Sequence, residues 1–174
     1  MLSMSNHFRM AALAAVFALA ACASKPPPAA PPSEAPPPPS APSQVQSNVM
    51  PGSVQDFRVN VGDTVHFEYD RYEVRGEDRD LLQRQAAWLQ KYPQVRVTIE
   101  GHCDERGTRE FNLALGARRA NAVKEYLVSL GVTSSRIDTI SYGKERPMCT
   151  ESDESCWAQN RRGVTTITSG AATS

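Results

Sequence analysis

One segment of the sequence gathers polar side chains in a pattern that could bind a small charged ligand. Residues 100–108 read Glu-Gly-His-Cys-Asp-Glu-Arg-Gly-Thr and join a predicted strand to a predicted helix. The free N–H groups at such a helix start favour anions. Arg119 follows Asp104 by 15 residues, and Asn112 lies two helical turns before Arg119 on roughly the same face. Asp104 could therefore accept from an ammonium group while Arg119 clamps a carboxylate, which would bind a zwitterion.

Spacing alone leaves a second interpretation of this pair open. A carboxylate in a loop and an arginine on a helix also form ordinary surface ion pairs, which contribute little to stability. In the ligand interpretation the two side chains face a cleft. Alanine at Asp104 or Arg119 is then expected to leave folding nearly unchanged.

An enzyme or metalloprotein is the rival class for the same segment. His102 and Cys103, beside Asp104 and Glu105, could suggest a thiol nucleophile or a zinc site. Adjacent residues of a strand point to opposite faces, however, and catalytic Cys and His are usually distant in sequence. Neither Cys-x-x-Cys nor His-Glu-x-x-His spacing occurs in the sequence. The sequence therefore predicts no catalytic residue, no metal site and no cofactor.

Alternating strands and helices must position these residues. Apolar alternation predicts strands at 64–69, 95–100, 137–142 and 163–168, and helical spacing predicts helices at 76–92 and 108–130. Gly131 is the expected cap of the longer helix. Its expected buried stripe is Leu113, Ala117, Ala120, Val123, Leu127 and Leu130. This order of elements indicates an α/β sandwich with the helices on one face of the sheet.

Composition separates a folded part from an unusual N-terminal region. Eleven of the 13 prolines lie between Pro26 and Pro51, so residues from Lys25 to about Val54 predict an extended tether. About 110 residues remain, enough for one core. The formal net charge is zero, which gives no reason to expect a nucleic-acid partner.

The first residues resemble a secretory signal. An apolar run at 10–21 follows Arg9 and ends at Cys22, and it is too short to span a membrane. Residues 19–22, Leu-Ala-Ala-Cys, resemble the lipobox of bacterial lipoproteins, which implies lipid on Cys22; a plain signal peptide with a chance cysteine is the alternative. Ala23 and Ser24 after the cysteine favour the outer membrane. The predicted divisions are 1–21 signal peptide, 22–55 lipidated N-terminus and tether, 56–170 folded domain and 171–174 loose tail.

Several ordered motifs resemble the OmpA-like peptidoglycan-binding family. They are Gly-His-Cys-Asp-Glu-Arg-Gly-Thr at 101–108, the stretch at 112–123, Ile-Ser-Tyr-Gly-Lys-Glu-Arg-Pro at 140–147 and Asn-Arg-Arg at 160–162. The stretch at 67–74 and the Asp-Glu-Arg-Gly-Thr variant narrow the resemblance to the family's lipoproteins of the Tol–Pal system. The resemblance covers nearly the whole folded part. It implies a β-α-β-α-β-β fold with a mixed sheet and helices packed on one face.

The resemblance also implies a ligand and a set of contacts. This family binds the peptide stem of peptidoglycan non-covalently at meso-diaminopimelate, with Asp104 at the ammonium and Arg119 at the carboxylate. The matching residues around them are Tyr69, Asp70, Glu105, Thr108, Asn112 and Leu115. Arg161 and Arg162 are expected to be structural or to face a partner. A TolB-like periplasmic protein, and other Tol components with it, are the implied partners in envelope integrity and cell division.

Three cysteines remain once Cys22 carries lipid. In an oxidising compartment Cys149 and Cys156, close in sequence, are the first choice for a disulfide, although several relatives have no such pair. Cys103 is expected to be a small buried thiol. The wall-binding domain of a flagellar stator shares this fold, but it would need a transmembrane helix, which the run at 10–21 cannot supply.

Overall fold

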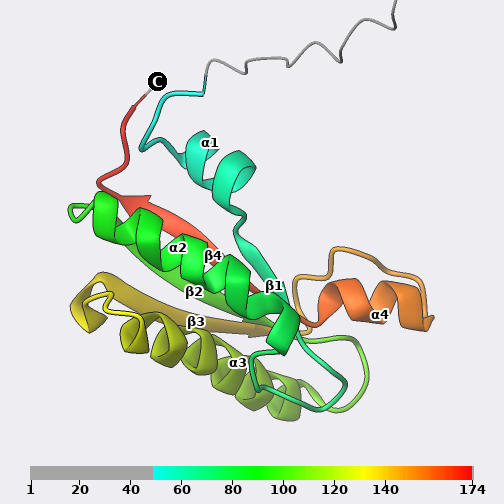
Figure 1. The fold of residues 1–174 in the computed structure, drawn as a ribbon. Helices are drawn as coiled ribbons and strands as arrows, with labels where there is room; N and C mark the ends of the chain where they lie inside the picture. Colours follow the sequence, from blue (N-terminus) through cyan, green and yellow to red (C-terminus); the bar gives the residue numbers. More distant parts are fainter. Residues whose placement is uncertain (1–48, 174) are drawn as a thin grey trace, which may run out of the picture. The chain divides into compact units, whose positions relative to one another are not determined.

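A four-stranded mixed sheet is the centre of the fold (Figure 1). The computed structural model describes residues 49–173, so the predicted signal peptide, Cys22 and the tether up to residue 48 lie outside the described residues. The strands are β1 (Thr64–His66), β2 (Arg96–His102), β3 (Ile137–Gly143) and β4 (Arg162–Ser169), in the order β1-β4-β2-β3. β2 and β3 are parallel, and β4 runs antiparallel to both β1 and β2. The predicted mixed sheet is confirmed.

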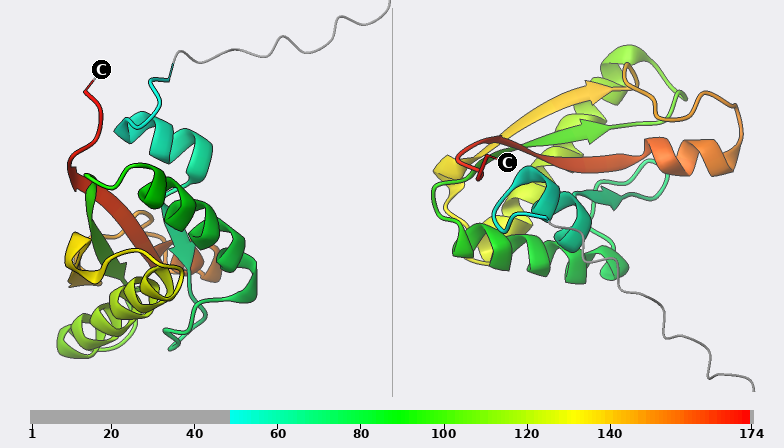
Figure 2. Two further views of the ribbon diagram at one scale, coloured as in Figure 1. Left: turned by 60° about the vertical axis from the view of Figure 1, so that its left-hand side comes forward. Right: turned by 90° about the horizontal axis from the view of Figure 1, so that it is seen from above.

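Two long helices pack on one face of this sheet (Figure 2). The 3-10 turn Gly76–Asp78 leads into α2 (Arg79–Lys91), and α3 spans Arg109–Ser129. Val97 and Ile99 alternate with more exposed residues along β2 and point toward the helices. The core between the layers includes Val65, Val97, Ile99, Ile137, Leu82, Ala86, Leu89, Ala120, Val123 and Leu127. The predicted α/β architecture is therefore confirmed.

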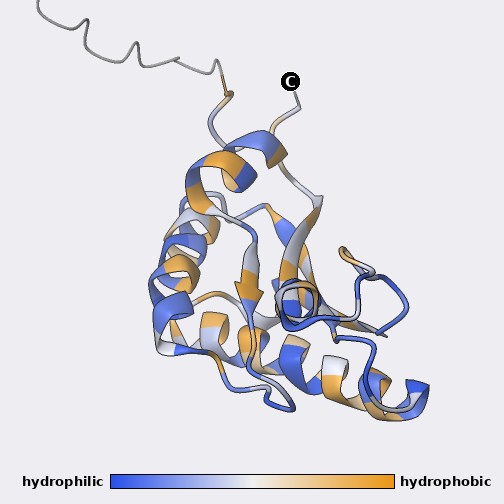
Figure 3. Cartoon of the chain, turned by 90° about the vertical axis from the view of Figure 1, so that its right-hand side faces the viewer, coloured by the Kyte–Doolittle hydropathy of each residue, from blue (hydrophilic) through white to orange (hydrophobic). Residues whose placement is uncertain are grey.

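The longer helix begins and ends where its capping residues predict. The Thr108 hydroxyl accepts from the Phe111 N–H at 3.2 Å, and Gly131, just past the end, has φ +95°. The predicted buried stripe is partly wrong, because Leu113 is 50% exposed and Ala117 is exposed as well. The buried positions are Asn112, Leu115, Gly116, Arg119, Ala120, Val123 and Leu127. The polar residues Asn112 and Arg119 thus belong to the buried face in the first half of α3. Figure 3 shows hydrophilic and hydrophobic residues mixed along this helix.

Two glycines set how closely α3 approaches β2. A Cβ atom on Gly101 would collide with the backbone carbonyl of Gly116, and a Cβ on Gly116 would meet the carbonyl of Gly101 at 2.9 Å. Glycine at both positions lets the helix backbone lie directly on the strand. This contact holds the loop after β2 beside the first turns of α3.

The fold begins before the predicted boundary at residue 56. Ser53 caps the short helix α1 (Val54–Asp56), which continues into a π-helical turn at Phe57–Val61. The Phe57 ring packs edge-on against the Trp88 ring at 4.9 Å. The Asp56 carboxylate accepts from Trp88 Nε1 at 2.8 Å, which ties α1 to α2. The last predicted tether residues are thus part of the folded domain.

The C-terminal end is paired, although the prediction was a loose tail. The Ala172 N–H donates to the carbonyl of Gly52 at 2.9 Å, and Ser53 and Ala172 form an isolated parallel bridge. The first and last described segments therefore lie side by side at one end of the sheet (Figure 1). Both backbone groups find partners in this way.

A short helix between β3 and β4 adds one element to the expected order. A 3-10 turn at Ser134–Arg136 precedes β3, and α4 spans Glu154–Asn160. The Asp153 carboxylate caps α4 by accepting from the Cys156 N–H at 2.9 Å.

A disulfide joins Cys149 to Cys156, and Cys103 is a buried free thiol. Within residues 49–173, the helices are too short or too polar to cross a membrane.

Candidate functional site

Six of the eight predicted ligand residues line one pocket of about 80 Å³. The pocket lies where the loop after β1, the loop after β2 and the first half of α3 meet. The six are Tyr69, Asp70, Asp104, Asn112, Leu115 and Arg119, and the wall is completed by Cys103, Arg106, Gly107 and Phe111. Arg106 stands inside the motif that identified the segment, yet no role was predicted for it. The described structure thus brings most of the predicted set together.

Arg119 holds the loop that carries two other pocket residues. Its side chain is 1% exposed and donates from Nε to the carbonyl of Arg71 at 2.8 Å and from Nη2 to that of Glu68 at 3.1 Å. Nη1 donates to the carbonyl of His102 at 2.8 Å. A buried charge with three backbone partners fixes the chain around it. The expectation that Arg119 contributes little to folding is therefore wrong.

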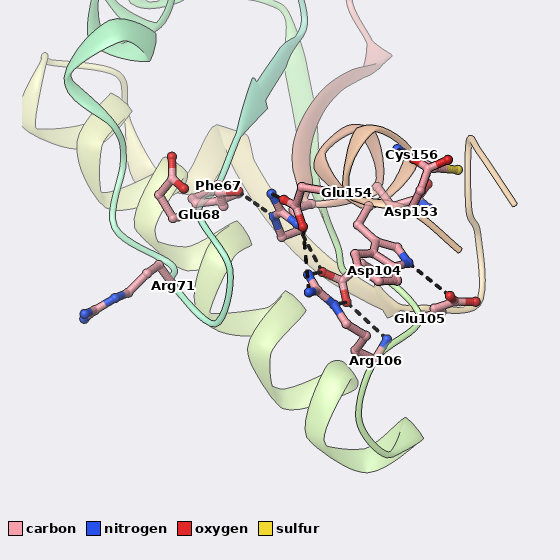
Figure 4. Close-up of polar contacts among 12 residues, drawn as sticks. Phe67, Glu68, Arg71, Asp104, Glu105, Arg106, Asp153, Glu154 and Cys156 are labelled. Carbon is pink, nitrogen blue, oxygen red and sulfur yellow. Dashed lines mark hydrogen bonds and ion pairs between the residues drawn. The ribbon is translucent and has the colours of Figure 1, made fainter. Parts of the chain in front are cut away.

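Both carboxylate oxygens of Asp104 are held by arginines (Figure 4). Oδ1 accepts from the Arg106 backbone N–H and from Arg106 Nε, both at 3.1 Å. Oδ2 accepts from Arg106 Nη2 at 2.6 Å and from Arg161 Nη1 at 3.4 Å. Burial acts to raise the pKa of Asp104, but the hydrogen bonds from Arg106 and Arg161 outweigh it and lower the pKa. Asp104 is thus ionised at neutral pH.

A second carboxylate closes this group into a ring. Glu154, in the first turn of α4, accepts from Arg161 Nη2 at 2.6 Å and lies 3.8 Å from Arg106 Nη1. Asp104, Arg106, Glu154 and Arg161 therefore alternate in sign, and we call them the charge ring. Arg161, expected to be structural or partner-facing, serves here as a structural link. Sequence spacing could not reveal the ring, because α4 reaches it across the fold.

Aromatic rings hold Arg106 from two sides. Its guanidinium carbon lies 4.1 Å from the centre of the Tyr69 ring and 4.1 Å from that of the Trp157 ring. Such cation–π contacts stabilise a partly exposed guanidinium. Trp157 belongs to α4, whose first turn is tied by the Cys149–Cys156 disulfide. This helix therefore contacts Arg106, a residue of the pocket wall.

Two predicted residues lie outside the pocket, and one inside it has an unusual backbone. Glu105 accepts from the Ser152 hydroxyl at 2.7 Å and from Trp157 Nε1 at 3.0 Å, so its carboxylate points toward α4. Thr108 caps α3. Asp70 is exposed at the pocket and has φ +54°, which only a small minority of non-glycine residues adopt. Such conformations gather at ligand-binding positions.

Cys103 is in a poor setting for nucleophilic chemistry. Burial raises the pKa of its thiol to about 11, and Sγ donates to the carbonyl of Asn112 at 3.3 Å. The thiolate needed for attack or metal binding is therefore disfavoured. Burial, with Arg162 and Arg146, lowers the pKa of the neighbouring His102 to about 4. No cluster of three or more His, Cys, Asp or Glu that could hold a metal ion occurs between residues 49 and 173.

The fold and the sequence both match a known class of domains. The family model described as OmpA family matches residues 66–161. Among solved structures, the chain resembles the peptidoglycan-associated lipoprotein of Burkholderia pseudomallei, with 43% identity and a TM-score of 0.60 over 61% of this chain and 90% of that one. It also resembles the C-terminal domain of Helicobacter pylori MotB, with 23% identity and a TM-score of 0.57 over 62% of this chain and 84% of that one. The MotB likeness concerns the fold alone.

Relatives of nearly the same length narrow the class. The chain is 51% identical to the peptidoglycan-associated lipoprotein of Mesorhizobium japonicum over 162 residues, which cover 93% of this chain and 92% of that protein. It is 51% identical to the peptidoglycan-associated lipoprotein of Rhizobium meliloti over 91% of this chain and 86% of that protein. This chain belongs to the OmpA family and, within it, to the peptidoglycan-associated lipoproteins.

Proposed function

We propose that this protein binds peptidoglycan non-covalently through the meso-diaminopimelate of the stem peptide, and performs no chemistry on it. The observation that carries the proposal is the single pocket lined by Tyr69, Asp70, Asp104, Asn112, Leu115 and Arg119. Membership of the OmpA family and the names of the relatives support the same ligand class.

The groups in the pocket match the charges of that ligand. The free end of meso-diaminopimelate carries one ammonium and one carboxylate. Arg119 lines the pocket, and three of its five N–H groups bind backbone carbonyls, so it is the positive charge of its guanidinium that favours a carboxylate there. Asp70 and Asp104 supply negative charge for the ammonium. Leu115 and the Phe111 ring offer apolar surface to the carbon chain.

The anchor and the partners follow from the sequence resemblance. We propose lipid on Cys22, residence in the outer membrane and a tether that lets the folded domain reach the wall through the periplasm. A TolB-like periplasmic protein and other Tol components are the proposed partners, in envelope integrity and cell division.

Co-sedimentation with purified peptidoglycan sacculi tests the ligand, with free meso-diaminopimelate as competitor. The informative variant is Asp70→Asn, because asparagine tolerates the same φ and only the charge is lost. We expect its binding to fall about tenfold, the effect of about 1.4 kcal/mol. Asp138→Asn, exposed at the start of β3, is the matched control and should bind normally. Undiminished sedimentation of Asp70→Asn, or no competition by meso-diaminopimelate, would contradict the proposal.

A further inference from the structure

We infer that Arg106 is a gate of this pocket: its guanidinium holds the Asp104 carboxylate, and a ligand ammonium gains that carboxylate only by displacing it. The inference rests on the proposed function, since it concerns the route by which that ligand reaches Asp104. It assigns Arg106 a part in specificity, because a ligand without a cation has nothing to exchange for the guanidinium.

The first observation is that Asp104 is not open to a ligand. The residue is 4% exposed, and its two oxygens accept four hydrogen bonds from two arginines. The bond from Arg106 Nη2, at 2.6 Å, is the shortest of the four. The pocket, of about 80 Å³, is lined by Arg106, which is one of the two cations that hold the Asp104 carboxylate. One of the cations on Asp104 must move.

The second observation identifies which cation can move. The Arg161 side chain is 6% exposed and is fixed by bonds to the Phe67 carbonyl at 3.0 Å and to Glu154 at 2.6 Å. The Arg106 side chain is 28% exposed. The backbone at this residue and the next is held, because Asn112 Nδ2 donates to the Arg106 carbonyl and Lys144 Nζ to that of Gly107, both at 2.7 Å, so only the side chain needs to move. Arg106 is therefore the cation at the pocket mouth, and Arg161 is the permanent one.

The third observation is that a displaced Arg106 keeps favourable contacts. Glu154 Oε2 lies 3.8 Å from Arg106 Nη1. The Glu154 side chain is 63% exposed, so once Arg106 leaves Asp104 it can form a closer ion pair with the guanidinium. The Trp157 face lies beside it. The charge ring holds two carboxylates and two guanidinium groups, so a ligand ammonium at Asp104 replaces a cation with a cation. The exchange leaves no carboxylate buried without a partner.

The test measures the affinity of purified protein for meso-diaminopimelate by calorimetry in a graded series at position 106. Arg106→Gln removes the competing charge, and Arg106→Lys keeps the charge but loses the bidentate bond. We expect affinity to rise in the order Arg, Lys, Gln, with Gln about tenfold tighter than wild type, the lower end for one hydrogen bond to a charged group. Arg109→Gln removes an equal charge from a nearby side chain that is 72% exposed, and it should bind as wild type.

Tryptophan emission gives a second readout that a purely structural role would not move. Displacement of Arg106 from Asp104 changes the position of its guanidinium over the Trp157 ring, whereas the other tryptophan, Trp88, is buried in the core. Meso-diaminopimelate should therefore change the emission of wild type but not of Arg106→Gln. Pimelate, which lacks both ammonium groups, should leave wild-type emission unchanged. The comparison of meso-diaminopimelate with pimelate needs only wild-type protein, so it tests the gate even if the variants fold poorly.

The outcomes separate the gate from the function it rests on. Wild type that fails to bind meso-diaminopimelate overturns the proposed ligand and the gate together. Wild type that binds, with affinities equal across the series or falling from Arg to Gln, overturns the gate alone. Only falling affinities would make Arg106 a direct contact for the ligand carboxylate. Binding to wild type without a change in emission also overturns the gate and leaves the function intact.

Discussion

Arg119 donates from Nε to the backbone carbonyl of Arg71 at 2.8 Å, across 48 positions of sequence. Through this bond and its neighbour at Glu68, a helix side chain shapes the loop that presents Tyr69 and Asp70 to the pocket. Folding and binding are therefore joined at one residue. A variant of Arg119 that loses binding is uninformative unless its stability is measured too.

Arg119→Ala should destabilise the protein by about 3–5 kcal/mol, as loss of a buried charged group leaves its partners unsatisfied. Urea denaturation followed by circular dichroism measures the free energy of unfolding. Arg118→Ala is the matched control, since the neighbouring arginine is exposed and lies over the Tyr72 ring at 5.8 Å. Similar unfolding curves for the two variants would refute the role assigned to Arg119.

Gly101→Ala should also destabilise the domain strongly, by about 3 kcal/mol or more, because overpacking forces backbone shifts. The added methyl group meets the Gly116 carbonyl, which belongs to a helix backbone and cannot turn aside. Gly76→Ala is the matched control, because it adds the same methyl group at a position where no heavy atom lies within 4 Å of the new Cβ. Thermal melting should separate the two variants widely, and a Gly101→Ala protein that melts with wild type would show that α3 can shift freely.

The elements with clear local signals could be predicted from the sequence, and those that depend on distant contacts could not. α3 was predictable because Thr108 and Gly131 mark its ends. α1 was missed because proline-rich sequence precedes it, and its packing depends on the contact between Phe57 and Trp88. Ser53 with Asp56 three residues later was the available signal, a helix-start pattern that the tether composition obscured.

The same division applies to the site. Family motifs bring Asp104 and Arg119 to one pocket, and the structure agrees. The motifs do not reveal that the loop at 68–71 folds over Arg119, nor that Arg106 and Arg161 hold Asp104. The contacts of Arg119 with that loop and of Arg161 with Asp104 join residues 48 to 57 positions apart, so no local pattern encodes them, whereas Arg106 and Asp104 are only two residues apart.

Loss of the Cys149–Cys156 disulfide should weaken the protein by about 2 kcal/mol, the chain-entropy value for so short a loop. The double variant Cys149→Ser, Cys156→Ser should also bind sacculi less well, because α4 carries Glu154 and Trp157 to Arg106. Denaturation and sacculus binding of the double variant, each compared with wild type, provide the check. Unchanged binding would show that α4 keeps its place without the bond.

Acid should destabilise the protein in a window set by His102. The pKa of His102 falls from 6.5 to about 4 through burial and the nearby Arg162 and Arg146, although Glu100 lies 3.5 Å away. Between pH 6.5 and 4 the unfolded chain binds a proton that the folded chain does not, so stability falls as pH falls, by at most about 3 kcal/mol. His102→Phe keeps a ring beside Tyr142 and removes the titration. Its free energy of unfolding should vary less over this window, and an unaltered pH dependence would contradict the assignment.

The most direct measurement of the central claim compares two kinds of sacculi. One kind carries meso-diaminopimelate at the third position of the stem peptide, and the other carries L-lysine, which lacks the terminal carboxylate. The guanidinium of Arg119 lines the pocket and would face that carboxylate, so binding of the purified protein should be at least about tenfold weaker on the lysine form, since one charged contact is lost. Equal binding to both kinds would contradict recognition of meso-diaminopimelate.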